Sequence, residues 1–365
     1  MSVRDTPQSE YKLRKRFLNK MTAASELHII VPGICGPLAE TSSIADSQFI
    51  KRWIKVLSQS DMQQSPLKLY EVFAALFDLS IDGDFPSAAL NMLADNNFDS
   101  SLNYMFADPV HMEADMNHVI LTSSADLAIN DDERDILCDV LNKHFVDDGL
   151  IFKCLAKDKW VLSSKDNIQL NTTPLLDAVG RNVNFILPKG DNSGYWKKTL
   201  TEVQMILHAN DINLVRENTG KQSINSLWFH GSGQLPNVNN CKVDCVCSND
   251  NVFKGLASHV QCNYLQLPES AQAYARHLLK NHSESINVLH LSDLEHLVNY
   301  SDVSIWMDRL SEVLNHWVYP LLKMANNNNI KVTLYPCNDK KYQFSKYNSY
   351  RFWRHGKLEQ HVTSY

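Results

Sequence analysis

The 365-residue sequence contains no run of eighteen apolar residues, so no transmembrane helix of ordinary length is expected. Residues 1–24 have no apolar segment of the kind that a secretory signal needs, and we expect a solvated N-terminal leader there. Lys and Arg number 35 against 41 Asp and Glu, a formal net charge of -6. Since nucleic acid binding depends on basic surface, we expect a cytoplasmic protein whose partners include neither nucleic acid nor a membrane.

Glycine-rich motifs are also missing. Only 12 glycines occur, and none builds the phosphate loop of nucleotide hydrolases or the dinucleotide fingerprint. The tripeptide Gly231-Ser232-Gly233 superficially resembles the nucleophile elbow of serine hydrolases but has a different spacing. These absences argue against the enzyme classes that are defined by those motifs.

The chain has 8 cysteines, and without an export signal we expect them to be reduced. Cys241, Cys245 and Cys247 form a C-x3-C-x-C cluster on a strand-like segment. A zinc site usually needs a second ligand pair, and none is evident nearby. We therefore interpret them as buried strand cysteines and keep metal binding as the alternative.

Short apolar runs at residues 27–31, 286–291 and 330–335 predict strands that are buried on both faces, as in parallel sheets. Amphipathic helical patterns lie between them, for example at residues 49–57 and 270–281. Strands that alternate with helices indicate an α/β fold with a parallel sheet and helices on both of its faces.

The middle of the chain differs from this pattern. It predicts a strand at residues 118–122, a helix at 131–145 and a hairpin at 150–163, which together suggest a small α+β module inserted into the core. The expected division is a leader at 1–24, the first part of the core at 25–104, the inserted α+β module at 105–211, the second part of the core at 212–358 and a tail at 359–365.

Three stretches carry a resemblance to a known family. The first is similar to the family pattern N-x-x-R, a glycine, then A-N-x-x-W-x-W-G-x-G. The second, residues 107–120, contains Asp108, His111, Asp115 and His118 before a helix and a hairpin, and the third is the strand–helix–strand order of residues 286–335. The residues of the first pattern are Asn213, Arg216, Gly220, Asn225, Trp228, Gly231 and Gly233.

The chain thereby resembles the archaeal-type cofactor-independent phosphoglycerate mutases and, more closely, a bacterial group of phosphoglycerate mutase-like regulatory proteins named RpfE. The resemblance implies an alkaline-phosphatase-like core and two divalent cations, Mn or Mg, held by carboxylates and histidines. It also implies an aspartate after the first core strand and an aspartate-histidine pair after the last. Here those strands run into Val31-Pro32-Gly33 and Pro336-Cys337-Asn338-Asp339, so the first aspartate and the histidine are missing and the last aspartate is displaced.

One metal motif is better preserved. His290, Asp293 and His296 follow a predicted strand, the usual place for ligands in open α/β sheets, although their spacing is compressed relative to the resembled motif. They are the candidate metal ligands. The alternative is a solvated loop that leads into a helix cap.

Two further groups are candidate sites. Asp108, His111, Asp115 and His118 combine carboxylates with histidines and would share a face if the segment were helical, whereas Pro109 and the following strand favour a polar linker. Arg216 and Asn225, with the turn at Gly231 and Gly233, form a candidate anion site. Arginine grips phosphate or carboxylate in a bidentate manner, and glycines allow close approach of the backbone.

Two hypotheses follow. In the first, the protein keeps a mutase-like fold without two-metal chemistry and acts as a binding or regulatory protein for a phosphorylated or acidic small molecule. In the second, it is a divergent metal-dependent phosphotransferase or phosphatase with a rearranged site. The sequence identifies no protein partner.

Overall fold

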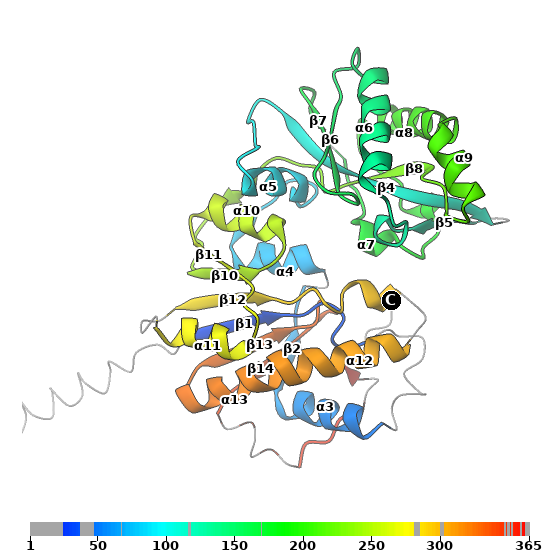
Figure 1. Cartoon of the computed structure of the whole chain (residues 1–365). Helices are drawn as coiled ribbons and strands as arrows, with labels where there is room; N and C mark the ends of the chain where they lie inside the picture. Colours follow the sequence, from blue (N-terminus) through cyan, green and yellow to red (C-terminus); the bar gives the residue numbers. More distant parts are fainter. Residues whose placement is uncertain are drawn as a thin grey trace, which may run out of the picture.

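We describe the protein from a computed structural model, shown in Figure 1. Two sheets organise the chain, a larger one in the core and a smaller one in a module that lies on one side of it. The described residues are 25–36, 47–66, 68–115, 118–168, 170–280, 285–299, 303–346, 348, 351, 353–357 and 360–361. The predicted leader lies outside these residues, as does most of the predicted tail.

The larger sheet has seven strands in the order β11-β10-β12-β1-β13-β14-β2. Its first five strands run parallel, and β14 and β2 extend the edge in antiparallel pairing. The strands are β1 (Glu26–Ile30), β2 (Asp61–Gln64), β10 (Cys245–Ser248), β11 (Asn263–Gln266), β12 (Ile286–His290), β13 (Lys331–Tyr335) and β14 (Lys340–Phe344). The predicted parallel α/β core is confirmed, with two antiparallel edge strands that the sequence did not reveal.

Helices cover both faces of this sheet because its strands alternate their apolar side chains between the faces. Leu27 and Ile29 of β1 face one cluster and Ile30 faces the other. The first face is covered by α3 (Gln48–Gln59), α11 (Ala271–Lys280), α12 (Val303–Val313) and α13 (Tyr319–Asn328), and the second by α4 (Leu69–Leu76), α5 (Ser87–Ala94) and α10 (Asn251–Val260).

The long helical segment near the end of the core is continuous. A π-helical stretch at Leu314–Val318 joins α12 to α13, and Pro320 lies in the first turn of α13. Pro320 has no backbone N–H to donate, and a widened turn before it accommodates the ring. None of the described helices is long and apolar enough to cross a membrane.

The smaller sheet belongs to the module. Strand β4 (Asn103–Asp115) pairs with β5 (His118–Thr122), β7 (Trp160–Ser164) and β8 (Ser226–His230), and β6 (Ile151–Cys154) pairs with β7. Around it lie α6 (Asp131–His144), α7 (Leu175–Ala178), α8 (Ser193–His208) and α9 (Asp211–Asn218). A two-stranded sheet of β3 (Leu79–Ser80) and β9 (Asn237–Val238) completes the strands that the structure describes.

Strand β8 lies in the module, whereas we expected it within the second part of the core. It pairs antiparallel with β4, with Phe106 opposite His230 and Asp108 opposite Trp228. Both faces of β8 are covered within the module, since Leu227 and Phe229 join one apolar cluster and Trp228 another. In the sequence such a strand looks like a core strand, because both kinds are buried on both sides.

Candidate functional site

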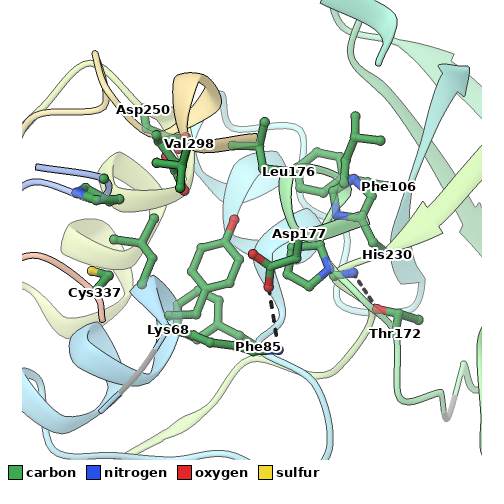
Figure 2. A pocket seen from close by; sticks show the side chains of 18 of the residues that line it. Lys68, Phe85, Phe106, Thr172, Leu176, Asp177, His230, Asp250, Val298 and Cys337 are labelled. Carbon is green, nitrogen blue, oxygen red and sulfur yellow. Dashed lines mark hydrogen bonds and ion pairs between the residues drawn. The ribbon is translucent and has the colours of Figure 1, made fainter. Parts of the chain in front are cut away.

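A cleft of about 810 Å³ separates the carboxyl edge of the core sheet from the module. Figure 2 shows Asp250, Val298 and Cys337 of the core on one side and Phe106, His230 and Thr172 of the module on the other. Both parts of the chain therefore build the walls of one cavity.

The core wall lies where the parallel strands end. Ile30 of β1 is level with His290 of β12 and with Tyr335 of β13, so the segments after these strands meet at one edge. Ligands in open α/β sheets bind outside the carboxyl ends of the strands, and the cleft is at that place. The lining residues that follow these strands include Pro32, Gly33, Glu295, Val298, Pro336 and Cys337.

The module wall carries a buried carboxylate–imidazole pair. Asp108 and His230 lie on neighbouring strands, and Asp108 Oδ2 is 2.9 Å from His230 Nε2. The other oxygen, Asp108 Oδ1, accepts the backbone N–H of Trp160 at 2.9 Å. The exposed fraction is 4% for Asp108 and 6% for His230, so both groups are held away from solvent.

The hydrogen bond to Asp108 determines which nitrogen of the His230 ring carries the proton. An ionised carboxylate only accepts hydrogen bonds, so Nε2 of His230 carries the proton that faces Asp108. In the neutral ring Nδ1 then has a free lone pair. Nδ1 is buried and has no hydrogen-bond partner among the described residues, while the His230 side chain lines the cleft.

The Phe106 ring contacts both the His230 ring and the Lys159 ammonium group. Its centroid is 5.0 Å from that of His230, and the Lys159 ammonium lies 5.0 Å from the same centroid. Lys159 lines the cleft, and no ion pair involves it within the described part of the chain. An aromatic face stabilises a cation without neutralising its charge, so Lys159 presents a positive group to the cleft.

Several carboxyl groups line the cleft, among them Asp177, Asp250 and Glu295. Burial raises the pKa of Glu295 to about 8, with the charges of Asp250 and Asp177 acting in the same direction and Lys159 acting against them. Asp177 lies 3.5 Å from the Lys68 ammonium, as the dashed line in Figure 2 shows. Glu295 is therefore mainly neutral at pH 7.

Thr172 forms a short polar network at the module side. Its hydroxyl donates to Asp84 Oδ2 and accepts the N–H of Gly231 at 3.0 Å. Burial raises the pKa of Asp84, and the hydrogen bonds from Thr172 oppose that shift. This network fixes the turn that follows His230.

Of the four residues of the predicted polar site, the structure places Asp108 in the cleft lining. The segment is strand β4, not a helix, so Asp108 and His111 face opposite sides of the sheet. His111 Nδ1 contacts the carbonyl oxygen of Ser223 at 2.8 Å, and Asp115 is paired with His118 at the end of the β4–β5 hairpin. Helical spacing therefore does not bring the four together.

The candidate anion site is divided as well. Arg216 is 1% exposed, and its guanidinium donates to Glu133 Oε2 at 2.8 Å, to Gln222 O at 2.7 Å and to Leu127 O at 2.5 Å. The Asn225 side chain hydrogen-bonds to the Met112 backbone, since its amide oxygen accepts the Met112 N–H and its amide nitrogen donates to the Met112 carbonyl oxygen. Gly231 lines the cleft, but Arg216, Asn225 and Gly233 are not among the lining residues.

The candidate metal residues do not converge. His290 is buried between Phe73 and Phe253, with Nδ1 at 3.1 Å from Ser248 Oγ, and burial lowers its pKa to about 4. His296 is exposed in a 3-10 turn. The described residues contain no group of three or more His, Cys, Asp or Glu that could hold a metal ion, so they do not fit the two-cation site that the resemblance implies.

The cysteine cluster has the predicted strand character in part. Cys245 and Cys247 are buried in β10, with exposed fractions of 3% and 0%. Cys241 precedes the strand and is half-buried. Burial raises the pKa of the Cys247 thiol to about 12, which is typical of an inert core cysteine.

Sequence reasoning missed His230 and Lys159 as members of the site. His230 ends a strand just before Gly231, at a position where the resembled pattern has tryptophan, and that departure was the available signal. Lys159 follows a hairpin turn and looks like an ordinary surface lysine. Only the fold brings it to the Phe106 ring.

Comparisons with known proteins give weak similarities. No family model matches the chain. A 2,3-bisphosphoglycerate-independent phosphoglycerate mutase of Methanosarcina barkeri is 24% identical over 173 residues, which cover 46% of this chain and 44% of that enzyme. A Methanosarcina mazei enzyme of the same name is 26% identical over 110 residues, 30% of this chain and 28% of the enzyme. The matched stretches thus span less than half of either relative.

Two solved structures are similar over a larger share of the chain. A protein from Pyrococcus horikoshii has a TM-score of 0.47 and 16% identity, covering 89% of this chain and 88% of that one. The cofactor-independent phosphoglycerate mutase of Thermoplasma acidophilum has a TM-score of 0.40 and 14% identity, covering 88% and 90%. The chain is similar, at low identity, to archaeal phosphoglycerate mutases that work without 2,3-bisphosphoglycerate.

Proposed function

We propose that this phosphoglycerate mutase-like protein binds a phosphorylated or acidic small molecule in the cleft and serves a binding or regulatory role. The observation that carries the proposal is Lys159, a cation on the cleft wall for which the described residues provide no ion pair. A cation that a neighbouring carboxylate does not neutralise is suited to an anionic ligand.

The surroundings of Lys159 support an anion of limited size. The Phe106 ring holds the ammonium on one side, and Glu295, with its pKa raised to about 8, is mainly neutral at pH 7. A neutral carboxyl group repels an anion much less than a carboxylate does. Lys68 also lines the cleft, but Asp177 already compensates its charge. Of these two lysines, Lys159 is therefore the better candidate for the first contact with the ligand.

A role without two-metal chemistry is supported by the residues that follow the core strands. The resemblance calls for metal-binding aspartates after β1 and β13, and this chain has Pro32-Gly33 and Pro336-Cys337 there. The closer resemblance to RpfE-type regulatory proteins agrees with a regulatory role in the cytoplasm.

The test is calorimetric titration of the purified chain with 3-phosphoglycerate and with inorganic phosphate, in the presence of Mn2+ or of a chelator. We expect binding that does not need metal and that weakens at least tenfold in Lys159→Met, which loses a charge-assisted contact. Lys153→Met is the matched control, since Lys153 is an exposed lysine on the neighbouring strand β6 and does not line the cleft.

Two results would count against the proposal. Equal affinity in the Lys159→Met and Lys153→Met proteins would show that the ligand does not use this cation. Turnover of 3-phosphoglycerate that requires Mn2+ would favour the metal-dependent phosphotransferase or phosphatase instead.

A further inference from the structure

His230 differs from the other polar groups of the cleft in having one nitrogen that is engaged and one that is not. Asp108 fixes Nε2–H, and Nδ1 is buried without a hydrogen-bond partner in the described part of the chain. A buried acceptor that lacks a partner is unfavourable, so a ligand that supplies a donor gains affinity at this point.

We propose that His230 selects ligands that carry a hydroxyl group, by accepting a hydrogen bond from that hydroxyl at Nδ1. This inference rests on the proposed function, because it assigns a second contact to the ligand that Lys159 binds. It adds a specificity-determining residue that neither the motifs nor the comparisons indicate.

The direction of the hydrogen bond follows from Asp108. Both oxygens of that carboxylate accept N–H groups, one from His230 and one from the Trp160 backbone. The ring can therefore leave Nε2 protonated and offer only a lone pair at Nδ1 in its neutral form. A lone pair binds a hydroxyl or an amine and repels a phosphate oxygen, so this nitrogen distinguishes the uncharged part of a ligand from its anionic part.

The spacing of the two contacts suits a small molecule. His230 and Lys159 flank the same Phe106 ring, each 5.0 Å from its centroid, so they lie no further apart than the sum of these two distances. A ligand that contacts both groups therefore needs an anionic group and a hydroxyl group that are separated by no more than this sum. The ligand class that we infer is a hydroxylated phosphate ester or hydroxy acid of limited length.

The experiment compares two phosphate esters of the same charge and chain length. Glycerol 1-phosphate carries hydroxyl groups and propyl phosphate carries none, and both are titrated into the full chain. We expect glycerol 1-phosphate to bind about three- to tenfold more tightly, the range that one hydrogen bond to a buried group provides.

The His230→Gln variant should remove this preference while still binding both esters. The glutamine amide can replace Nε2–H as a donor to Asp108 and has nothing in the place of Nδ1. His259→Gln is the matched control, because His259 Nε2 contacts the Pro236 carbonyl oxygen at 2.8 Å and the side chain is not in the cleft lining. The control should keep the preference of the unaltered protein.

A second measurement on the unaltered protein does not depend on any variant. The 15N spectrum of histidine should show His230 as the Nε2–H tautomer, with an Nδ1 signal that moves on adding glycerol 1-phosphate and not on adding propyl phosphate. Equal affinity for the two esters, or a preference retained in His230→Gln, would overturn the role of His230 and leave the proposed function standing. If neither ester nor inorganic phosphate binds, the proposed function is wrong as well.

Discussion

The two walls of the cleft differ in the residues that they contribute. The core wall is formed where parallel strands end, and it presents Pro32, Gly33 and Cys337 together with a mainly neutral Glu295, with Asp250, and with Lys68, which is paired with Asp177. The module wall presents Asp108, His230 and Lys159, which are charged or hydrogen-bonding groups. In an open α/β sheet the ends of the core strands are the usual source of such groups.

The two walls therefore contribute different kinds of side chain to one cavity. In our proposal the first contact with an anion comes from Lys159 on the module wall. A site must be argued from its side chains and not from the fold that holds them. Three substitutions test whether the two walls have different roles. They also separate residues that stabilise the module from residues that face the cleft.

The largest effect is expected at Arg216, which stabilises the module and does not face the cleft. Arg216→Ala leaves Glu133 without its partner in a nearly buried pair with side-chain exposures of 1% and 12%. We expect the free energy of unfolding to fall by about 3–5 kcal/mol in urea denaturation. Lys221→Ala, at an exposed position nearby, should change it by less than about 0.5 kcal/mol. If Arg216→Ala keeps its stability but loses affinity for phosphate, Arg216 belongs to the binding site after all.

Gly231, in the turn on the module wall, should give the next effect. It has φ +65°, and an added Cβ would lie 2.0 Å from Ser87 Oγ. Gly149 has φ +66° with nothing within 4 Å of its added Cβ, so Gly149→Ala isolates the backbone term of about 1–2 kcal/mol. Because of the steric conflict, we expect Gly231→Ala to lower the free energy of unfolding by about 1–3 kcal/mol more than Gly149→Ala does. Equal thermal stability of the two variants would show that the turn relaxes freely.

The last expected effect is a change in pH dependence at Glu295 on the core wall. Its pKa is raised from 4.5 to about 8, so between these values the unfolded chain loses the proton before the folded chain does. The stabilising contribution of the neutral group is complete below pH 4.5 and is lost as the pH rises through about 8. Glu295→Gln should therefore flatten the decline in thermal stability between pH 5 and pH 9, whereas an unchanged decline would place its cause elsewhere.

Much of the fold could be predicted from the sequence because it depends on local pattern. Residues 27–31, 286–291 and 330–335 were expected as buried strands, and β1, β12 and β13 confirm them. Helices α3 and α6 were also located, since one side of each helix is apolar. Strands β2 and β14 were missed, because short strands of mostly polar residues carry no such pattern.

The site could be predicted much less well. Asp108 was named, but as one of four residues on a supposed helical face, and in β4 its neighbours in that set point elsewhere or lie at a hairpin end. Arg216 was expected to bind an anion, and no property of its sequence neighbourhood indicates that Glu133, 83 positions earlier, takes its guanidinium.

Residue type and short-range periodicity in the sequence were enough for the α/β class and for the buried parallel strands β1, β12 and β13. Only the tertiary structure decided which polar groups face the cleft. Asp108 and His230 are 122 positions apart and meet because β4 and β8 pair in one register. A shift of β8 by one residue in that register would turn His230 to the other face of the sheet and away from Asp108. Such long-range pairing depends on how the whole module packs, and no local pattern encodes it.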